Sequence, residues 1–235
     1  MTLSIIPIAG VPEIASGDEL AELLGDAASA QDTPLSDADC LVVTQKIVSK
    51  AEGRLVELDP GDPDARRRLI ESESTRILRR RGELIISETR HGFVCANAGI
   101  DLSNVPDGVA ALLPIDSDRS AQHLREALRA RRGVEVAVVI SDTFGRPWRL
   151  GLTDVAIGVA GLAAVLDLRG TRDGAGRELQ VTEIAVADEV AGAAELVMGK
   201  SSGIPAAIVR GLDPTFHAEG RARDLVRAPS EDLFR

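Results

Sequence analysis

The sequence has few of the residues that disulfide-rich or zinc-binding proteins need. Only two cysteines, Cys40 and Cys95, occur in 235 residues. No Cys-x-x-Cys pair accompanies them, and the three histidines His91, His123 and His217 are scattered without metal-ligand spacing. These absences exclude a disulfide scaffold and give no support to a zinc site.

Positive charge is also in short supply. Lys and Arg number 27 against 37 Asp and Glu, for a net charge of -10. This balance argues against nucleic acid or an anionic membrane as a main partner, because both favour a basic surface. The N-terminus lacks the pattern of a signal peptide, and no apolar run approaches a membrane span. We therefore expect a cytoplasmic protein with no membrane partner.

Lysine is the scarcest charged residue, and its distribution is uneven. Only Lys46, Lys50 and Lys200 occur beside 24 arginines. Two lysines four residues apart share one face of a helix or flank a turn, where an ammonium group suits a phosphate as a point charge. A solvated helix start explains the pair equally simply.

The segments that are present indicate an α/β protein. Apolar residues make up 44% and charged residues 27% of the chain, which is typical of a globular domain. Some strands are joined by turns too short for a crossover, so we expect a mixed sheet. Residues 1–235 are expected to form a single catalytic unit, as one large domain or two interlocked subdomains.

The expected strands are residues 3–8, 40–44, 84–86, 134–140, 179–186 and 206–209. The expected helices follow Ser16 or Asp18 and cover residues 63–81, 116–133, 153–165 and 188–197.

Asp142 and Thr143 follow the strongest buried-strand signal in the chain. Open α/β sheets place ligands at the carboxyl ends of their strands. A carboxylate and a hydroxyl side by side offer the hard oxygen ligands that Mg²⁺ or Mn²⁺ prefers. An ordinary turn-capping aspartate is the alternative. Asp101, with Gly99 before it and Asn104 after it, is the second carboxylate that would complete a binuclear site, although Asp-x-x-Asn also stabilises ordinary loops.

The third lysine lies in MGKSSGIP, residues 198–205. Gly-Lys-Ser suggests a P-loop, but position 194 is Ala194 instead of glycine and the segment follows a helix instead of a strand. A Walker A motif is thus rejected. A Gly-, Lys- and Ser-rich loop that cradles phosphate with its backbone N–H groups remains. Trp148, the single tryptophan, is expected to serve packing.

Taken together, several segments resemble the coenzyme F420-0:γ-glutamyl ligase family, either its free-standing ligases or the ligase domain of the actinobacterial fusion with a nitroreductase-like domain. The match runs in order over nearly the whole chain. Its segments are IAGVPEI at 8–14, VVTQKIVSKAEGR at 42–54, NAGIDLSNV at 97–105, VAVVISDTFGRPWR at 136–149, VTEIAVADEVAGAAELVMGK at 181–200 and IVRG at 208–211.

The resemblance implies a family-specific mixed fold, neither P-loop nor Rossmann, in a homodimer. It also implies GTP-dependent addition of L-glutamate to coenzyme F420-0, with Mg²⁺ or Mn²⁺, two per site, and K⁺. By position it gives Asp101, Asp142 and Thr143 as metal ligands, and Asp101, Asp142 and Lys50 as catalytic residues. The implied nucleotide-binding residues are Val11, Pro12, Glu13, Ile14, Gln45, Lys50, Asn104, Met198, Gly199, Lys200, Ser201, Ser202, Gly203, Ile204 and Pro205.

Amide formation from a carboxylate needs an activated acyl group. GTP supplies one by transferring its γ-phosphoryl group to give an acyl phosphate, which the glutamate amine attacks, so that GDP and phosphate are released. Two alternatives stay open from the residues alone. One is a ligase or phosphotransferase that uses metal and nucleotide with another carboxylic acid. The other is a nucleotide-binding regulator without catalytic activity.

Overall fold

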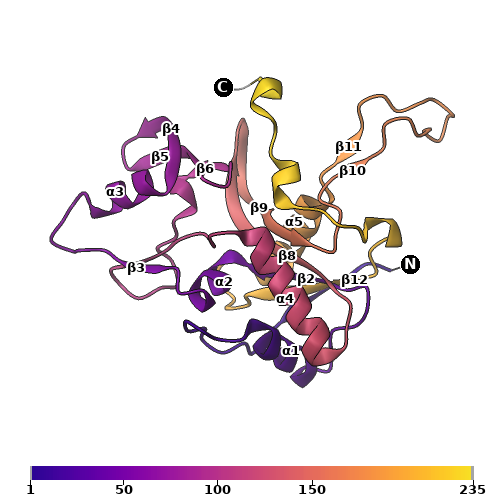
Figure 1. The fold of residues 1–235 in the computed structure, drawn as a ribbon, viewed down its shortest axis with the longest axis horizontal. Coiled ribbons are helices and arrows are strands. Elements are labelled where there is room, and N and C mark those ends of the chain that lie inside the picture. The colour runs from indigo at the N-terminus through magenta and orange to yellow at the C-terminus, as the bar shows by residue number, and fades with distance from the viewer. Residues whose placement is uncertain (1, 234–235) are drawn as a thin grey trace.

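A computed structural model of the chain describes residues 2–233. Its largest sheet has five strands in the order β1-β12-β2-β8-β9 (Figure 1). β2 and β8 pair in parallel and the other neighbours are antiparallel. This confirms the expected mixed α/β fold, because a Rossmann sheet is mostly parallel. The strand bounds are β1 Ser4–Ile8, β2 Cys40–Thr44, β8 Ala137–Arg146, β9 Arg149–Ala160 and β12 Ala206–Arg210.

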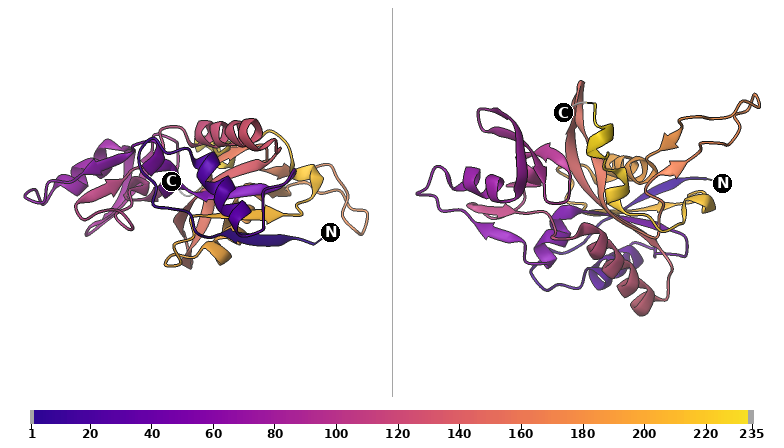
Figure 2. Two further views of the ribbon diagram at one scale, coloured as in Figure 1. Left: turned by 90° about the horizontal axis from the view of Figure 1, so that it is seen from below. Right: turned by 45° about the horizontal axis from the view of Figure 1, so that its top comes forward.

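Three long helices cover this sheet. α4 (Ser117–Arg132) lies along one face of the sheet, as the left panel of Figure 2 shows, and it packs against α1 (Leu20–Ala30). α5 (Val186–Met198) packs against β9, β1 and β12. The main core forms where these helices meet the apolar strands. It contains fully buried side chains from each layer, including Leu24, Leu41, Leu128, Ile140 and Met198.

The ends of α4 follow the sequence signals closely. The Asp116 carboxylate accepts a hydrogen bond from the Arg119 N–H, as an N-cap does. Gly133 ends the helix with φ of 70°, a left-handed conformation that glycine adopts without steric cost. For α1 the expected cap was wrong, because Glu19 holds the N-cap position without a side-chain cap. Asp18 instead accepts a hydrogen bond from the Ala15 N–H.

A smaller lobe, at the left of Figure 1, contains the segments between α2 (Gln45–Ala51) and α4. It has its own hydrophobic cluster, built on Ile70, Ile85, Ile100 and Leu112. Whether the two lobes behave as interlocked subdomains stays a prediction. The elements of this lobe are β3 Leu55–Glu57, α3 Ala65–Ser72, β4 Ser74–Arg81, β5 Leu84–Thr89, β6 Val94–Ala96, the 3-10 turn η1 Asn97–Gly99 and β7 Val109–Ala111.

The expected helix over residues 63–81 was wrong beyond its first half. Helix α3 ends at Ser72, and the basic run 79–81 belongs to strand β4, which pairs with β5. Gly82 has φ of 58° in the hairpin between them. A glycine with positive φ serves a helix end and a tight hairpin equally well, so the same signal fitted both structures.

The expected helix over residues 153–165 was also wrong, because most of this segment is strand β9. Its apolar residues are buried from Ala156 to Ala160. Gly158 is needed there, since a Cβ atom would come within 2.3 Å of the Ser117 carbonyl oxygen at the start of α4. A nearly continuous buried run fits a covered strand as well as a helix, so periodicity alone did not separate them.

The expected strand over residues 179–186 is mostly absent from the described chain. Only β11 (Glu183–Ile184) pairs there, with β10 (Leu166–Asp167). These two short strands carry a long arm that projects from the body at the upper right of Figure 1. Within residues 2–233, no helix combines the length and the apolar character that crossing a membrane requires.

Candidate functional site

The candidate site lies where β2 ends beside β8. Thr44, the last residue of β2, pairs with Ser141, and the chain then enters α2 (Gln45–Ala51). β8 continues to Arg146, paired only with β9. Asp142 therefore lies within a β-hairpin, although the sequence placed it just after a strand. Its place beside the carboxyl end of a parallel strand agrees with the expected location of a ligand crevice.

The fold brings Asp142 and Asp101 close enough for their charges to interact. The pKa of Asp142 is raised to about 7, mainly by burial; the charges of Asp101 and Asp154 add to the rise, while the Thr143 backbone N–H and Lys200 oppose it. Asp101 forms an ion pair with Lys46, whose Nζ lies 2.8 Å from Asp101 Oδ2. Despite its burial, hydrogen bonds from Lys46 and Ser103 keep the pKa of Asp101 below its usual value. One carboxyl group thus favours protonation and its neighbour stays ionised.

Asp101 owes its position to an unusual stretch of backbone. Asn97, Ala98 and Gly99 all have positive φ, between 52° and 70°. A Cβ atom at Gly99 would lie 2.8 Å from the Leu113 side chain, so only glycine fits there. The Asp101 backbone then exchanges hydrogen bonds with Ala111. The strained turn and this bridge direct the carboxylate to Lys46.

Thr143 lies next to Asp142 but belongs to a different cluster. Successive side chains of a strand point to opposite faces. The Thr143 hydroxyl donates to Asp154 Oδ1, and the Ser141 hydroxyl donates to Asp154 Oδ2 over 2.9 Å. Lys200 hydrogen-bonds Thr143 and lies 3.2 Å from Asp154 Oδ1. Asp154 is thus the centre of a buried network.

Sequence reasoning missed Asp154. It is only 3% exposed and lies opposite Thr143 in the β8–β9 register. The segment around it was expected to be helical, and a helix gave no reason to place it near Asp142. Recognising GLTDVAIGVA as a strand after the turn at Pro147 would have found it, because antiparallel pairing then brings Asp154 beside Thr143.

Each of the three lysines has an acidic partner. Lys46 pairs with Asp101, and Lys200 lies 3.3 Å from Glu195 as well as near Asp154. Lys50 pairs with Glu13. The Lys50 side chain is only 7% exposed, whereas that of Glu13 is 83% exposed. A buried ammonium group therefore meets its partner at the protein surface.

The residues expected around the nucleotide are partly assembled. Helix α2 holds Gln45 and Lys50, and the 11–14 segment reaches Lys50 through Glu13. The Gln45 amide oxygen accepts a hydrogen bond from Ser49, but among residues 2–233 no partner satisfies its buried Nε2. Asn104 lies in an exposed loop with φ of 52°. Val11 and Pro12 lie toward the surface and Ile14 is buried in the core.

Residues 199–205 form a loop between α5 and β12, as expected. Helix α5 ends at Met198, whose carbonyl oxygen accepts a hydrogen bond from the Ser202 hydroxyl. Near its other end the Pro205 carbonyl accepts a hydrogen bond from the Thr44 N–H, 2.9 Å away. The loop therefore joins the end of β2, and Lys200 reaches from it to the β8–β9 hairpin.

The donors fit a hard divalent cation in chemistry but not yet in arrangement. Asp101, Asp142, Asp154 and Thr143 offer carboxylate and hydroxyl oxygens, the ligands that Mg²⁺ and Mn²⁺ prefer. Burial and, to a smaller extent, the charges of Asp101 and Asp154 raise the pKa of Asp142. In the part of the chain that is described, however, no three acidic, histidine or cysteine side chains converge as a ready metal site. Lys46 and Lys200 now hold two of the carboxylates.

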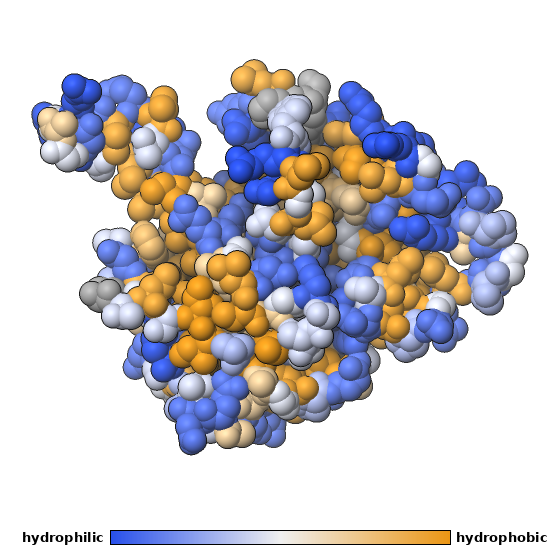
Figure 3. Space-filling model, turned by 180° about the vertical axis from the view of Figure 1, so that it is seen from behind, coloured by the Kyte–Doolittle hydropathy of each residue, from blue (hydrophilic) through white to orange (hydrophobic). Residues whose placement is uncertain are grey.

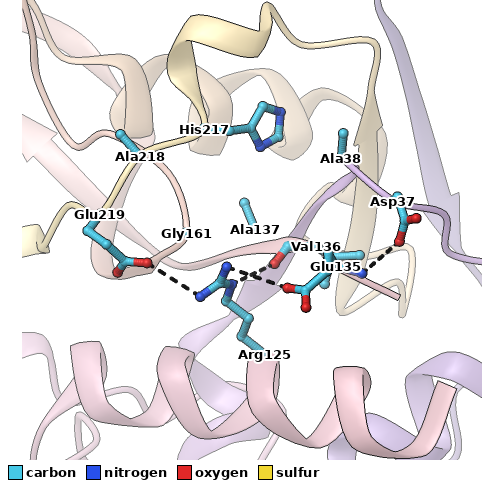
Figure 4. Close-up of a pocket in the computed structure, with 10 residues that line it drawn as sticks. All are labelled: Asp37, Ala38, Arg125, Glu135, Val136, Ala137, Gly161, His217, Ala218 and Glu219. Carbon is cyan, nitrogen blue, oxygen red and sulfur yellow. Dashed lines mark hydrogen bonds and ion pairs between the residues drawn. The ribbon is translucent and has the colours of Figure 1, made fainter. Parts of the chain in front are cut away.

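A large cavity lies elsewhere. It has a volume of about 590 Å³ and sits at the start of β8, lined by Arg125, Ala137 and His217 among others. Figure 4 shows Arg125 and His217 on opposite sides of it, with Glu135 and Glu219 paired to the guanidinium group. Ala137 and Asp142 are five residues apart along β8, so this cavity is separate from the carboxylate cluster.

Comparison with known proteins identifies the family of the chain. Residues 10–211 match the family model described as F420-0:Gamma-glutamyl ligase. Relatives named coenzyme F420:L-glutamate ligase include one from Methanothermobacter thermautotrophicus, 45% identical over all of both chains. Another, from Methanopyrus kandleri, is 44% identical over all of this chain and 98% of the relative. A third, from Methanocaldococcus jannaschii, is 40% identical over 86% of each chain. The chain therefore belongs to the coenzyme F420-0:γ-glutamyl ligase family.

Proposed function

We propose that the protein joins L-glutamate to coenzyme F420-0 at the expense of GTP. One observation carries the proposal: in a very acidic chain with three lysines, Lys46 and Lys200 ion-pair with Asp101 and Asp154, whose charges act on Asp142, at one end of the main sheet. The third lysine, Lys50, lies buried in α2, the helix that follows β2. Cations that surround a carboxylate cluster suit a site for a phosphorylated co-substrate and a divalent cation. The family description supplies the acceptor, coenzyme F420-0, and the names of the relatives supply the amino acid, L-glutamate.

The reaction requires activation of the acceptor carboxylate. Its oxygen attacks the γ-phosphorus of GTP, GDP leaves, and an acyl phosphate forms. The glutamate amine then attacks the acyl carbon, a proton leaves the nitrogen, and inorganic phosphate departs. Phosphoryl transfer is catalysed mainly by positioning and by neutralising charge.

Each part of the site has a role in this proposal. Lys50 and Lys200 bind phosphate oxygens, and the 198–205 loop closes over them from its anchor at Thr44. Asp101 and Asp142 hold Mg²⁺ or Mn²⁺, which supplies Lewis-acid stabilisation of the phosphate charge when bound. Thr143 does not take this role, because its hydroxyl donates to Asp154 on the other face of β8. Lys46 keeps Asp101 ionised. Two cations per site and a K⁺ requirement remain proposals from the family resemblance.

The test is mass spectrometry of coenzyme F420-0 after incubation with GTP, L-glutamate and Mn²⁺. We expect glutamate-sized increments in the acceptor and release of phosphate that depends on both acceptor and glutamate. Phosphate release with another carboxylic acid but not with coenzyme F420-0 would favour the broader ligase or phosphotransferase. Nucleotide binding without any turnover would favour a regulator.

We also propose that the protein acts as a homodimer. Large apolar side chains are exposed on the β8–β9 hairpin: Trp148 is 79%, Leu150 96% and Leu152 67% exposed. Figure 3, which views the molecule from behind, shows further apolar residues in orange on that face and on the projecting arm. On the arm, Val181 is 83% exposed. Exposed apolar surface of this extent favours association.

Replacing Leu150 with Asp should shift the protein from dimer to monomer in sedimentation velocity. A carboxylate at an apolar interface is costly to desolvate, whereas the side chain is almost fully exposed within one chain, so the fold should be kept. Leu3→Asp, at another exposed leucine, is the matched control. A wild-type protein that sediments as a monomer at all concentrations would contradict the dimer.

A further inference from the structure

A second cavity lies beside the carboxylate cluster and has no role in the function proposed so far. Its volume is about 250 Å³. Four segments line it: residues 92–94 at the start of β6, the β8–β9 hairpin, the start of α5 and the C-terminal residues 222–227. In Figure 1 the yellow C-terminal segment runs beside this hairpin, and η3 (Ala222–Leu225) contacts β9. A Cβ atom at Gly92 would lie 3.4 Å from Val226, so the turn and the C-terminal segment approach each other closely. We refer to this space as the aromatic cavity.

The walls of the aromatic cavity are apolar and partly aromatic. Phe93 and Phe144 lie edge to face with ring centroids 6.2 Å apart. Val155, Leu225 and Val226 add aliphatic surface. In a chain with four phenylalanines and no tyrosine, two of the phenylalanines line this one space. Such walls suit a flat aromatic ring, which gains from edge contacts as well as from burial.

Two strands run from the cavity toward the carboxylate cluster. Phe144 and Asp142 are two residues apart on β8, so they point to the same face, about 7 Å apart along the strand. Phe93 and Cys95 are two residues apart at β6. Burial and the neighbouring charge of Asp142 raise the pKa of the Cys95 thiol to about 12, which places Cys95 close to Asp142. The two pairs therefore run side by side from the cavity to the carboxylates.

Polar groups at the cavity match an acidic aromatic ligand. Arg227 lines its exposed edge, and none of residues 2–233 forms an ion pair or hydrogen bond with the Arg227 guanidinium group. Asp188 also lines the cavity and already accepts a hydrogen bond from the Ala156 N–H, 2.8 Å away. A ring that carries an anionic group would find a free cation at the edge. A substituent of the ring would reach Asp142 along β8.

We infer that the aromatic cavity binds the ring system of the acceptor, a flat aromatic heterocycle with anionic groups, and so directs the acceptor carboxylate to Asp142 and Asp101. The inference rests on the proposed function. It adds residues for acceptor recognition, Phe93, Phe144, Val226 and Arg227, that are separate from the lysines proposed for GTP. Selection of the acceptor and binding of the nucleotide thus fall to different parts of the site.

The test measures the dissociation constant of coenzyme F420-0 and that of GTP separately, in the presence of Mn²⁺. Val226→Trp fills the cavity from its half-buried edge, and Phe144→Leu removes a ring but keeps an apolar side chain. Both should weaken acceptor binding about tenfold, because an aromatic contact and its buried area are lost. Arg227→Gln should raise the KM for the acceptor. The GTP dissociation constant and the thermal unfolding midpoint should stay close to wild type in all three variants.

The matched control is Ala218→Trp, which fills the separate cavity near His217 and should leave acceptor binding unchanged. If Val226→Trp and Phe144→Leu bind and use coenzyme F420-0 like wild type, the aromatic cavity is not the acceptor site, although the proposed function stands. If Val226→Trp instead changes the oligomeric state, a second copy of the chain occupies the cavity and the inference is overturned. If wild-type protein neither binds nor uses coenzyme F420-0, both proposals fail.

Discussion

Replacing Asp142 with Asn should lower turnover by about 10²-fold or more, because an amide keeps the shape of the side chain but removes the charge that holds a hard cation near the reacting phosphate. Asp101→Asn should act in the same direction, since the two carboxylates lie in electrostatic contact. The measurement is turnover against Mn²⁺ concentration. Binding of Mn²⁺, followed by electron paramagnetic resonance, should weaken in parallel.

The pH dependence of stability gives this prediction a second readout. The pKa of Asp142 is raised from 3.8 to about 7 in the folded protein. Between these values the folded state keeps a proton that the unfolded state has lost, so the free energy of unfolding falls as pH rises through this window. Asp142→Asn removes the carboxyl group and should flatten that part of the curve. The variant should therefore be folded, and above pH 7 no less stable than wild type without metal.

Asp167→Asn is the matched control, because Asp167 is an exposed carboxylate on the arm, ion-paired with Arg169. It should leave turnover and Mn²⁺ binding unchanged. Normal turnover of both Asp142→Asn and Asp101→Asn at limiting Mn²⁺ would place the cation elsewhere, and Asp154 would then be the next carboxylate to replace.

Local sequence signals correctly predicted the elements whose signals fit only one kind of secondary structure. Strand β2 has the expected bounds, and α4 begins and ends at its expected cap residues. The errors fall where two structures share a signal. Gly82 served a hairpin instead of a helix end, and the small and apolar residues of β9 fitted a buried helix equally well. In both places pairing with a neighbouring strand, β5 or β8, decided the structure. A local sequence pattern does not show which strand will pair with a segment.

The site shows the same limit. Strand position and residue type pointed to Asp142, Asp101 and Lys200, and the structure places them in one region. The ion pairs could be identified only from the three-dimensional structure. Nothing in the sequence joins Lys46 to Asp101, 55 residues away, or Lys200 to Asp154. Asp154 was missed because residues 153–165 were expected to form a helix, which gave no reason to place Asp154 beside Thr143. The aromatic cavity combines segments more than 130 residues apart, and no local pattern indicates it.

Replacing Lys50 with Met should weaken GTP binding by about tenfold to a hundredfold, because a charge-assisted hydrogen bond to a phosphate oxygen is lost. The Lys50 side chain is 7% exposed, so its ammonium group is held in place by its surroundings. Methionine keeps the apolar stem and fills the space. The freed partner, Glu13, is 83% exposed and returns to water, so stability should change little. Titration calorimetry with GTP and Mn²⁺ measures the affinity, and thermal unfolding measures the stability.

Two further variants separate phosphate binding from a purely structural ion pair. Arg131→Met removes a cation that pairs with Glu19 and Glu22 at the surface, and it should leave GTP affinity unchanged although the net charge changes equally. Glu13→Gln breaks the pair with Lys50 but keeps the ammonium group. If Lys50 serves only that pair, Glu13→Gln should reproduce the whole effect of Lys50→Met. If Lys50 binds phosphate, Glu13→Gln should retain most of the affinity, because the buried cation then loses a competing partner and keeps its ligand.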